Sequence, residues 1–277
     1  MRAEELLTIA RSVAVTAGEL AARRRSEGVE IAASKSSPED VVTLADREVE
    51  ALIRSLLADA RPQDGFFGEE SEADVGSSGL TWVVDPIDGT VNYLYGVPHY
   101  AVSIAVVEGG PDPLTWMALA GAVVNPAISE VFTATRGGGA FLGERRLAVV
   151  AAELPLALVG TGFAYLAERR REQADTLVGL VGEVRDIRRS GTASLDLCSV
   201  ACGRLNAYYE SGLKPWDHAA GALIAAEAGA RVTGWGGAPA SQDFILAAPP
   251  TLAATLETLL AGQSTHSRSL PAAPPVG

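Results

Sequence analysis

Apolar residues recur at helical spacing in two stretches near the N-terminus, from about Ala3 to Arg25 and from about Thr43 to Leu57. Both are predicted to be helices, separated by the Ser- and Pro-rich loop Ser34–Pro38. Shorter apolar and β-branched runs then predict one sheet that these helices cover. Its expected strands are Thr81–Val84, Ala101–Val107 and Leu114–Val124, followed by a hairpin of Ile128–Thr135 and Ala140–Val149.

The second half of the chain alternates strand-like and helix-like segments, which predicts a mixed α/β fold. Strands are expected at Ala157–Thr161, Asp186–Arg189, Leu205–Glu210 and Phe244–Ala248, and helices at Glu168–Val184, Ala193–Cys202, Trp216–Gly229 and Leu252–Leu260. We expect an N-terminal lobe over residues 1–150 and a C-terminal lobe over 151–262. Residues 263–277 are rich in Ser, Pro and Ala, and we expect them to be a disordered tail.

The chain of 277 residues has 34 acidic and 22 basic side chains, a formal net charge of −12 at pH 7. This charge argues against nucleic-acid partners, which require Lys and Arg to displace phosphate counterions, and against an anionic membrane surface. No run reaches the roughly 18 apolar residues of a membrane span. Glu4 and Glu5 stand where a secretory signal would be basic, so we expect a cytoplasmic protein.

Three groups of acidic residues lie among glycines where predicted helices begin, in segments 68–71, 85–90 and 216–221. In the middle group, an apolar run places Asp85 at the end of a buried strand, and a proline turn leads to Asp88. Two carboxylates held so close repel each other unless a proton or a cation lies between them, and hard oxygen ligands select Mg²⁺. The backbone N–H groups of Gly89 and Thr90 would then face a phosphate at the start of the next helix.

Each of these acids also has an interpretation that needs no ligand. Asp85 and Asp88 could form an Asx-turn, although that leaves unexplained why an aspartate ends a buried strand. Glu69 could be a solvated loop acid. Asp217 could be the N-cap of the apolar helix that follows it, a role that is compatible with binding a cation.

The segments Gly68–Ser71, Trp82–Tyr93 and Trp216–Gly221 resemble, in order and spacing, the three signature motifs of the inositol monophosphatase family of Mg²⁺-dependent, lithium-sensitive phosphatases. The resemblance extends from about residue 5 to about residue 262. Val159–Phe163 and Ala207–Glu210 are most similar to the actinobacterial inositol-1-monophosphatases. The resemblance implies a layered αβαβα sandwich, which agrees with the predicted alternation of helices and strands.

The resemblance implies one Mg²⁺ on Glu69, Asp85 and the carbonyl of Ile87, and a second on Asp85, Asp88 and Asp217. A third, weaker metal near Glu69 is implied by the same analogy. In such a two-metal arrangement one ion lowers the pKa of a bound water, and the other neutralises charge on the departing ester oxygen.

By the same resemblance, Thr90 and Asp46 orient the attacking water and accept its proton, and Glu69 also takes part in catalysis. From its helix position alone, Asp46 could instead be an ordinary surface acid. The implied substrate contacts are Glu69, Ile87, Asp88, Gly89, Thr90, Ala193, Glu210 and Asp217. Glu210 would accept hydrogen bonds from inositol hydroxyls, although an acid at a strand end facing water is an open alternative.

Several basic residues near the motifs keep more than one interpretation. Lys35 could reach the phosphate or the third metal, or it could be a solvated loop lysine. Arg188 and Arg189 could serve the substrate or a subunit contact. His99 and His218 are interpreted as structural because neither has a second His or Cys at ligand spacing.

The expected partner is a small phosphate monoester, with myo-inositol 1-phosphate as the first hypothesis. A sister activity on histidinol phosphate, fructose 1,6-bisphosphate or a 3′-phosphonucleotide is the nearest alternative. A non-catalytic regulatory protein is a further one, although such a protein would be expected to have lost some metal ligands. The resemblance also implies a homodimer, with the glycine run Gly137–Gly139 as a possible contact.

Overall fold

The structure is a computed structural model that describes residues 2–34 and 41–267. Its helices are α1 (Arg2–Glu27), α2 (Leu44–Ala60), α3 (Thr90–Tyr95), α4 (Ala167–Val181), α5 (Ala193–Ala201), α6 (Pro215–Glu227) and α7 (Pro250–Ser267). The large sheet contains β3 (Gly65–Gly68), β4 (Leu80–Asp88), β5 (Ala101–Glu108), β6 (Met117–Asn125), β7 (Glu130–Thr135), β8 (Gly139–Leu142) and β9 (Arg145–Arg146). The small sheet contains β10 (Leu158–Thr161), β11 (Asp186–Arg188), β12 (Ala207–Glu210), β13 (Arg231–Thr233) and β14 (Ile245–Ala248).

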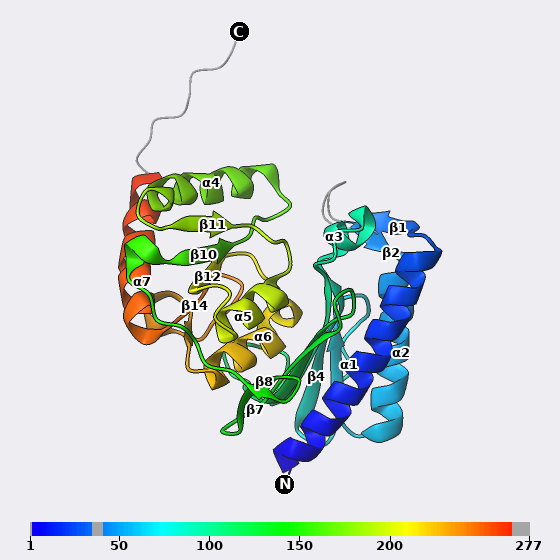
Figure 1. Ribbon diagram of the computed structural model, residues 1–277. Coiled ribbons are helices and arrows are strands. Elements are labelled where there is room, and N and C mark those ends of the chain that lie inside the picture. Colours follow the sequence, from blue (N-terminus) through cyan, green and yellow to red (C-terminus); the bar gives the residue numbers. More distant parts are fainter. Residues whose placement is uncertain (1, 35–40, 268–277) are drawn as a thin grey trace.

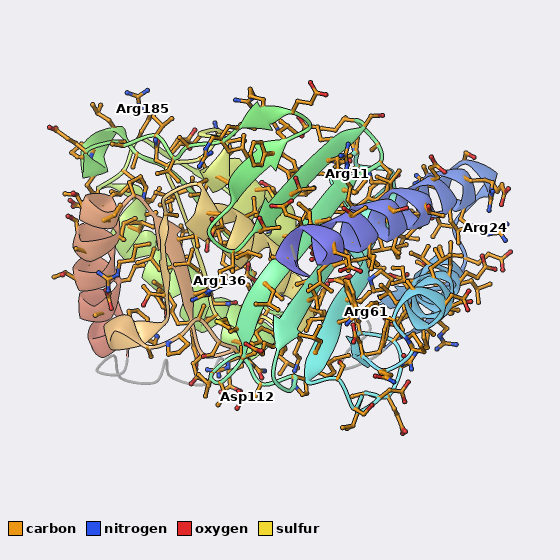
Figure 2. The ribbon with its side chains drawn as sticks, turned by 90° about the horizontal axis from the view of Figure 1, so that it is seen from below. Arg11, Arg24, Arg61, Asp112, Arg136 and Arg185 are labelled. Carbon is orange, nitrogen blue, oxygen red and sulfur yellow. The ribbon has the colours of Figure 1, made fainter. Side chains whose placement is uncertain are left out.

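Helices and sheets alternate in five layers (Figure 1). Helices α1 and α2 cover one face of the large sheet, and Figure 2 shows α1 crossing that face with labelled charged side chains such as Arg11 at the outside. Helices α5 and α6 fill the space between the two sheets, and α4 and α7 cover the far face of the small sheet. The arrangement is the predicted αβαβα sandwich.

Neighbouring side chains on β4 point to opposite layers, as strand geometry requires. Trp82 and Val84 belong to the cluster beneath α1 and α2, whereas Val83 belongs to the cluster beneath α5 and α6. All nine residues of β4 are buried, because helices cover both faces of the strand. An acidic residue on this strand is therefore also buried.

The two sheets are built with different strand pairings. In the large sheet β3 and β4 are parallel, and the pairs from β4 to β9 are antiparallel. In the small sheet β10 is parallel to both β11 and β12, while β14 is antiparallel to β12 and β13. The strands of the large sheet come from residues 65–146 and those of the small sheet from 158–248. The division into lobes at residue 150 stays a prediction.

The structure corrects several expected boundaries. β4 does not end at Asp85 but continues to Asp88, and helix α4 ends at Val181, before Gly182. The short strands β3 and β13 and the hairpin of β1 (Ile31–Ser34) with β2 (Val41–Thr43) were not predicted. Helix α7 continues to Ser267, into the segment expected to be a disordered tail. The rest of that tail and Lys35 lie outside the described residues, so those predictions are not tested.

Among the described residues, no helix is both long and apolar enough to cross a membrane. Cys198 is fully buried in the cluster between the large sheet and helices α5 and α6, and Cys202 packs against the same cluster. Both thiols are free. Cys198 is therefore a core residue, and Cys202 lies at the edge of the same core.

Candidate functional site

A β-bulge places Asp85 and Asp88 on the same face of β4. Asp85 pairs with Ser103 of β5 and Asp88 pairs with Ala101, so three steps along β4 correspond to two along β5. Without the extra residue, side chains three apart would point to opposite faces. Since Ala101 belongs to the cluster beneath α5 and α6, both carboxylates face the layer of these helices.

Gly89 makes the close approach between β4 and the loop before α5 possible. Its φ of +91° lies in the left-handed region, and a Cβ there would stand 2.5 Å from the Thr192 hydroxyl oxygen. Thr192 in turn donates to the carbonyl of His99 at 2.8 Å. Replacement of Gly89 by any other residue would therefore push apart the segments that carry Asp88 and Ala193.

Each acid of the central group is anchored by a backbone N–H. Asp85 Oδ1 accepts from the N–H of Ile87 at 3.1 Å, which is the predicted Asx-type bond. Asp88 Oδ2 accepts from the backbone N–H of Ser194 at 2.7 Å and from its hydroxyl at 2.5 Å. The same residue therefore ties Asp88 to the first turn of α5.

Asp217 is the third residue of α6, and its carboxylate accepts from the backbone N–H of Lys214 at 2.6 Å. The N-cap position belongs to Lys214, so the interpretation of Asp217 as the N-cap is wrong by three residues. The carboxylate nevertheless satisfies a backbone donor at the helix start, as a capping box does.

Burial and mutual repulsion raise the pKa values of these carboxylates. Burial is the largest cause for Asp85, Asp88 and Asp217, and the charge of Glu69 raises the pKa of all three. For Asp88 the pKa rises to about 7 although the two bonds from Ser194 act in the opposite direction. Four acids that disfavour one another's charge are typical of a site where a cation binds.

The donor set fits Mg²⁺ in its chemistry, because it consists of carboxylate oxygens and a strand carbonyl. As the side chains lie here, no three His, Cys, Asp or Glu residues within the described ranges come close enough together to hold a metal ion. Anchoring bonds engage Asp85 Oδ1, Asp88 Oδ2 and Asp217 Oδ2. The predicted ligands thus surround one region without converging on a point.

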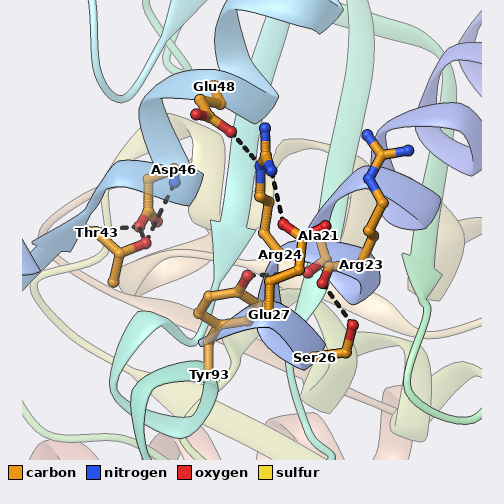
Figure 3. A network of polar contacts seen from close by, with 9 residues as sticks. All are labelled: Ala21, Arg23, Arg24, Ser26, Glu27, Thr43, Asp46, Glu48 and Tyr93. Carbon is orange, nitrogen blue, oxygen red and sulfur yellow. Dashed lines mark hydrogen bonds and ion pairs between the residues drawn. The ribbon is translucent and has the colours of Figure 1, made fainter. Parts of the chain in front are cut away.

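Asp46 approaches the same region from the opposite layer. Its carboxylate accepts from the backbone N–H of Thr43 at 2.8 Å and also contacts the Thr43 hydroxyl, forming the capping box at the start of α2 (Figure 3). Only 1% of Asp46 is exposed, so the surface-acid interpretation is wrong. Burial, opposed by the bonds from Thr43, raises the pKa of Asp46 to about 7.

Thr90, the first residue of α3, links Asp46 to the bulge. Its hydroxyl lies 3.2 Å from Asp46 Oδ1 and 3.1 Å from the carbonyl oxygen of Ile87, so it can donate to either. Tyr93 holds the short helix in place by donating from its fully buried hydroxyl to the carbonyl of Ala21 at 2.9 Å (Figure 3). The sequence-predicted pair of Thr90 and Asp46 is thus in hydrogen-bond contact.

Glu210 ends β12 in the second half of the chain. The hydroxyl of Tyr208 donates to its carboxylate, and burial raises the pKa of Glu210 to about 7, with Arg189 acting in the opposite direction. Arg188, in contrast, is exposed and paired with Asp186 at 2.5 Å. Of the two predicted arginines, only Arg189 acts on a predicted substrate residue.

Sequence reasoning missed the residue that holds the Glu69 loop. Glu50, which is 2% exposed, accepts from the backbone N–H of Glu70 at 2.8 Å and also contacts the Ser71 hydroxyl. A Cβ on Gly68 would lie 2.4 Å from Glu50 Oε2, so only glycine fits there. The available signal was spacing, since Glu50 lies one helical turn after Asp46 on the same face of α2.

Neither histidine belongs to a group of potential metal ligands among the described residues. Burial lowers the pKa of His99, and it lowers that of His218 to about 4. The His218 ring packs near Trp116, with ring centroids 6.1 Å apart. Both rings are therefore neutral at physiological pH, which agrees with their structural interpretation.

The comparison with known proteins gives the same family as the sequence motifs. The sequence model of the inositol monophosphatase family matches residues 2–268. A Mycobacterium tuberculosis protein called inositol-1-monophosphatase SuhB is 50% identical over 219 residues, which cover 76% of this chain and 73% of that protein. The Nus factor SuhB of Pseudomonas aeruginosa is 42% identical over 87% of this chain and 89% of its own length.

The fold comparison agrees. The crystal structure of the extragenic suppressor protein suhB from Bartonella henselae superposes with a TM-score of 0.83 at 37% identity, covering 92% of this chain and 98% of that one. Together with the phosphatases among the relatives, this indicates a phosphatase enzyme whose substrate is a small phosphate ester. The chain belongs to the inositol monophosphatase family.

Proposed function

We propose that this protein is a Mg²⁺-dependent, lithium-sensitive phosphomonoesterase that hydrolyses myo-inositol 1-phosphate to myo-inositol and phosphate. The observation that carries the proposal is the group of acids Glu69, Asp85, Asp88 and Asp217, in which the charge of Glu69 raises the pKa of the three aspartates, beside the hydrogen-bonded pair of Thr90 and Asp46. Relatives named inositol-1-monophosphatase support the choice of substrate.

Glu69, Asp85 and the Ile87 carbonyl would hold one Mg²⁺, and Asp85, Asp88 and Asp217 a second, with a third near Glu69. When bound, the cations supply positive charge that attracts the phosphate and acidifies water. The protein's own residues then supply orientation and proton transfer.

Thr90 would orient the attacking water through its hydroxyl, and Asp46 would accept the proton through it. A carboxylate with a pKa of about 7 suits a general base at neutral pH, because it is partly ionised and still basic. The backbone N–H groups of Gly89 and Thr90 would contact the phosphate, while Ala193 and Glu210 would contact the inositol.

Ser194→Ala should weaken Mg²⁺ binding about 10- to 100-fold, the usual effect of removing a group that orients a metal ligand. The change deletes the hydroxyl that donates to Asp88 Oδ2 but keeps the backbone bond. Equilibrium titration of Mg²⁺ by calorimetry measures it. Ser199→Ala, on the same helix α5, is the control, and equal affinities of the two variants would contradict the role of Ser194.

The metal-free protein should lose stability as pH rises from about 4 to 7. The pKa values of Asp46 and Asp88 are about 7 in the folded protein and near 4 in an unfolded chain, so the folded state binds more protons between these values. Each pKa unit per group is worth about 1.4 kcal/mol.

Thermal unfolding with EDTA at pH 5 and pH 8 tests this prediction. The Tm should be lower at pH 8 than at pH 5, and Mg²⁺ should restore it at pH 8 more than at pH 5, because protons and the cation compete for the same oxygens. A metal-free Tm that rises steadily over this range would contradict the pKa directions.

The choice of substrate is tested by initial rates of phosphate release. myo-Inositol 1-phosphate should give a higher kcat/KM than histidinol phosphate, fructose 1,6-bisphosphate or a 3′-phosphonucleotide, and Li⁺ should inhibit the reaction. Faster turnover of histidinol phosphate would leave the phosphatase assignment intact and overturn the substrate.

The homodimer stays a prediction, and the N–H groups of Gly137 and Gly139 are engaged within the chain by Glu227 at 2.8 and 2.9 Å.

A second candidate arises because relatives as similar as 42% and 44% identical are called Nus factor SuhB, which is not the name of a phosphatase. A non-catalytic regulatory role would not need the four carboxylates of the proposed metal site. The absence of phosphate release from all four substrates in the presence of Mg²⁺ would favour it.

A further inference from the structure

In the small sheet, two glycines leave room for the side chains of Tyr208 and Glu210. β10 and β12 are adjacent and parallel (Figure 1). In this pairing Gly160 lies opposite Tyr208. A Cβ on Gly162 would lie 1.9 Å from Glu210 Oε2, and one on Gly160 would lie 3.2 Å from the Tyr208 ring. Gly160 in β10 and Gly162 just after it therefore leave space where Tyr208 and Glu210 lie.

Tyr208 and Glu210 are two residues apart on β12 and so share a face. Tyr208 is fully buried, and its hydroxyl donates to Glu210 Oε2. A buried hydroxyl needs a partner, and here that partner is the acid predicted to read the substrate. The bond fixes one carboxylate oxygen and leaves Oε1 for a further donor.

Two groups partly offset the burial that raises the pKa of Glu210. Arg189 favours the charged form of Glu210, and it acts in the same direction on Asp196, a 2%-exposed acid on α5. The guanidinium lies over Gly191, where a Cβ would stand 2.6 Å from it. A cation and a hydroxyl donor thus both act on Glu210.

We propose that Tyr208 is a positioning residue that orients Glu210 and thereby sets the preference for phosphate esters of polyols over esters without free hydroxyls. The inference rests on the proposed function, in which Glu210 accepts a hydrogen bond from a substrate hydroxyl. A fixed carboxylate oxygen rewards a hydroxyl at one place, and an acceptor left unpaired penalises its absence.

The test compares myo-inositol 1-phosphate with p-nitrophenyl phosphate, which has no hydroxyl donor. Tyr208→Phe should raise the KM for the inositol ester about tenfold, with kcat nearly unchanged, because a hydrogen bond to a charged group is lost. Both constants for p-nitrophenyl phosphate should stay near those of the original protein. Glu210→Gln shows how much discrimination between the two esters is lost when the carboxylate itself is removed.

Tyr209→Phe is the matched control. Tyr209 lies next along β12 but points to the opposite face, into the cluster with α7, and its hydroxyl interacts with Thr161. This variant should keep the ratio of the two kcat/KM values. Gly162→Ala is a second route, since its Cβ would displace the Glu210 carboxylate without removing the Tyr208 hydroxyl. It should lose the same discrimination.

The outcomes separate the two proposals. If Tyr208→Phe keeps the discrimination while Glu210→Gln loses it, the positioning role is overturned and the phosphatase stands. An equal loss on both substrates with Tyr208→Phe would show a purely structural role and would also overturn it. If Glu210→Gln changes nothing, Glu210 does not read the substrate. If the original protein hydrolyses neither ester with Mg²⁺, the proposed function itself fails.

Discussion

Asp85→Asn should lower kcat for phosphate release at saturating Mg²⁺ by about 10³-fold or more. Asp85 is the carboxylate proposed to bridge both cations, and stabilisation of transition-state charge by metals is worth several kcal/mol. The amide has nearly the same shape and relieves the repulsion from Glu69, Asp88 and Asp217. The metal-free variant should therefore be as stable as the original protein or more so.

The control for this variant is Asp64→Asn, which makes the same chemical change at another carboxylate of low exposure. Asp64 pairs with Arg61 at 2.9 Å and accepts from the Trp82 indole at 3.0 Å, so its loss should lower Tm but not kcat at 25 °C. An Asp85→Asn variant that keeps its rate would contradict the assignment of Asp85. A variant that loses both its rate and its folded circular dichroism spectrum is replaced by Asp88→Asn, for which the same loss of rate is expected.

Thr90→Val should lower kcat by about 10²- to 10³-fold without weakening Mg²⁺ binding by a comparable factor, since proton transfer by a positioned group contributes 10²–10⁴-fold. Valine keeps the shape of threonine but removes the hydroxyl that contacts Asp46 and the Ile87 carbonyl. Stopped-time phosphate assays give kcat, and calorimetry gives the Mg²⁺ affinity.

Thr90→Ser is the informative companion because it restores the hydroxyl. It should recover most of the lost rate. The fall in its rate at acidic pH, which we assign to protonation of Asp46, should be kept. If serine and valine at position 90 are equally slow, the methyl group and not the hydroxyl matters, and the proton path through Thr90 is wrong.

The sequence motifs identified the acids but not the way in which the backbone unites them. Alternation along β4 predicts that Asp85 and Asp88 point apart, and only the bulge, which is visible in the pairing with β5, puts them on one face. Proline and glycine near the motif indicated an irregularity there. Its type depends on the neighbouring strand, which local sequence does not reveal.

The features that the sequence did not reveal are mainly contacts between distant segments. Ser194 binds Asp88 across 106 positions of the chain, and no local pattern on α5 indicates that partner. The resemblance gave Asp46 its partner Thr90, but the helix position alone left a surface acid as the alternative, because that view omits α3, whose first residue contacts Asp46. Tyr208 could have been found, because residues two apart on a strand share a face.

The short elements were missed for another reason. β3 and β13 have four and three residues, too few for a hydrophobic period, and their pairing with β4 and β14 makes them strands. Apart from the C-terminal end of α7, the longer helices and buried strands were predicted within a few residues, because packing on a sheet requires a sustained apolar face.

The most direct measurement is phosphate release from myo-inositol 1-phosphate by EDTA-treated protein as Mg²⁺ is added back, with the occupancy of Mg²⁺ followed in parallel by calorimetry. Hydrolysis should be absent without the cation and should rise with occupancy, and the Asp85→Asn protein should remain inactive at every concentration. A rate that persists in EDTA, or that Asp85→Asn retains, would contradict the carboxylate site as the centre of the enzyme.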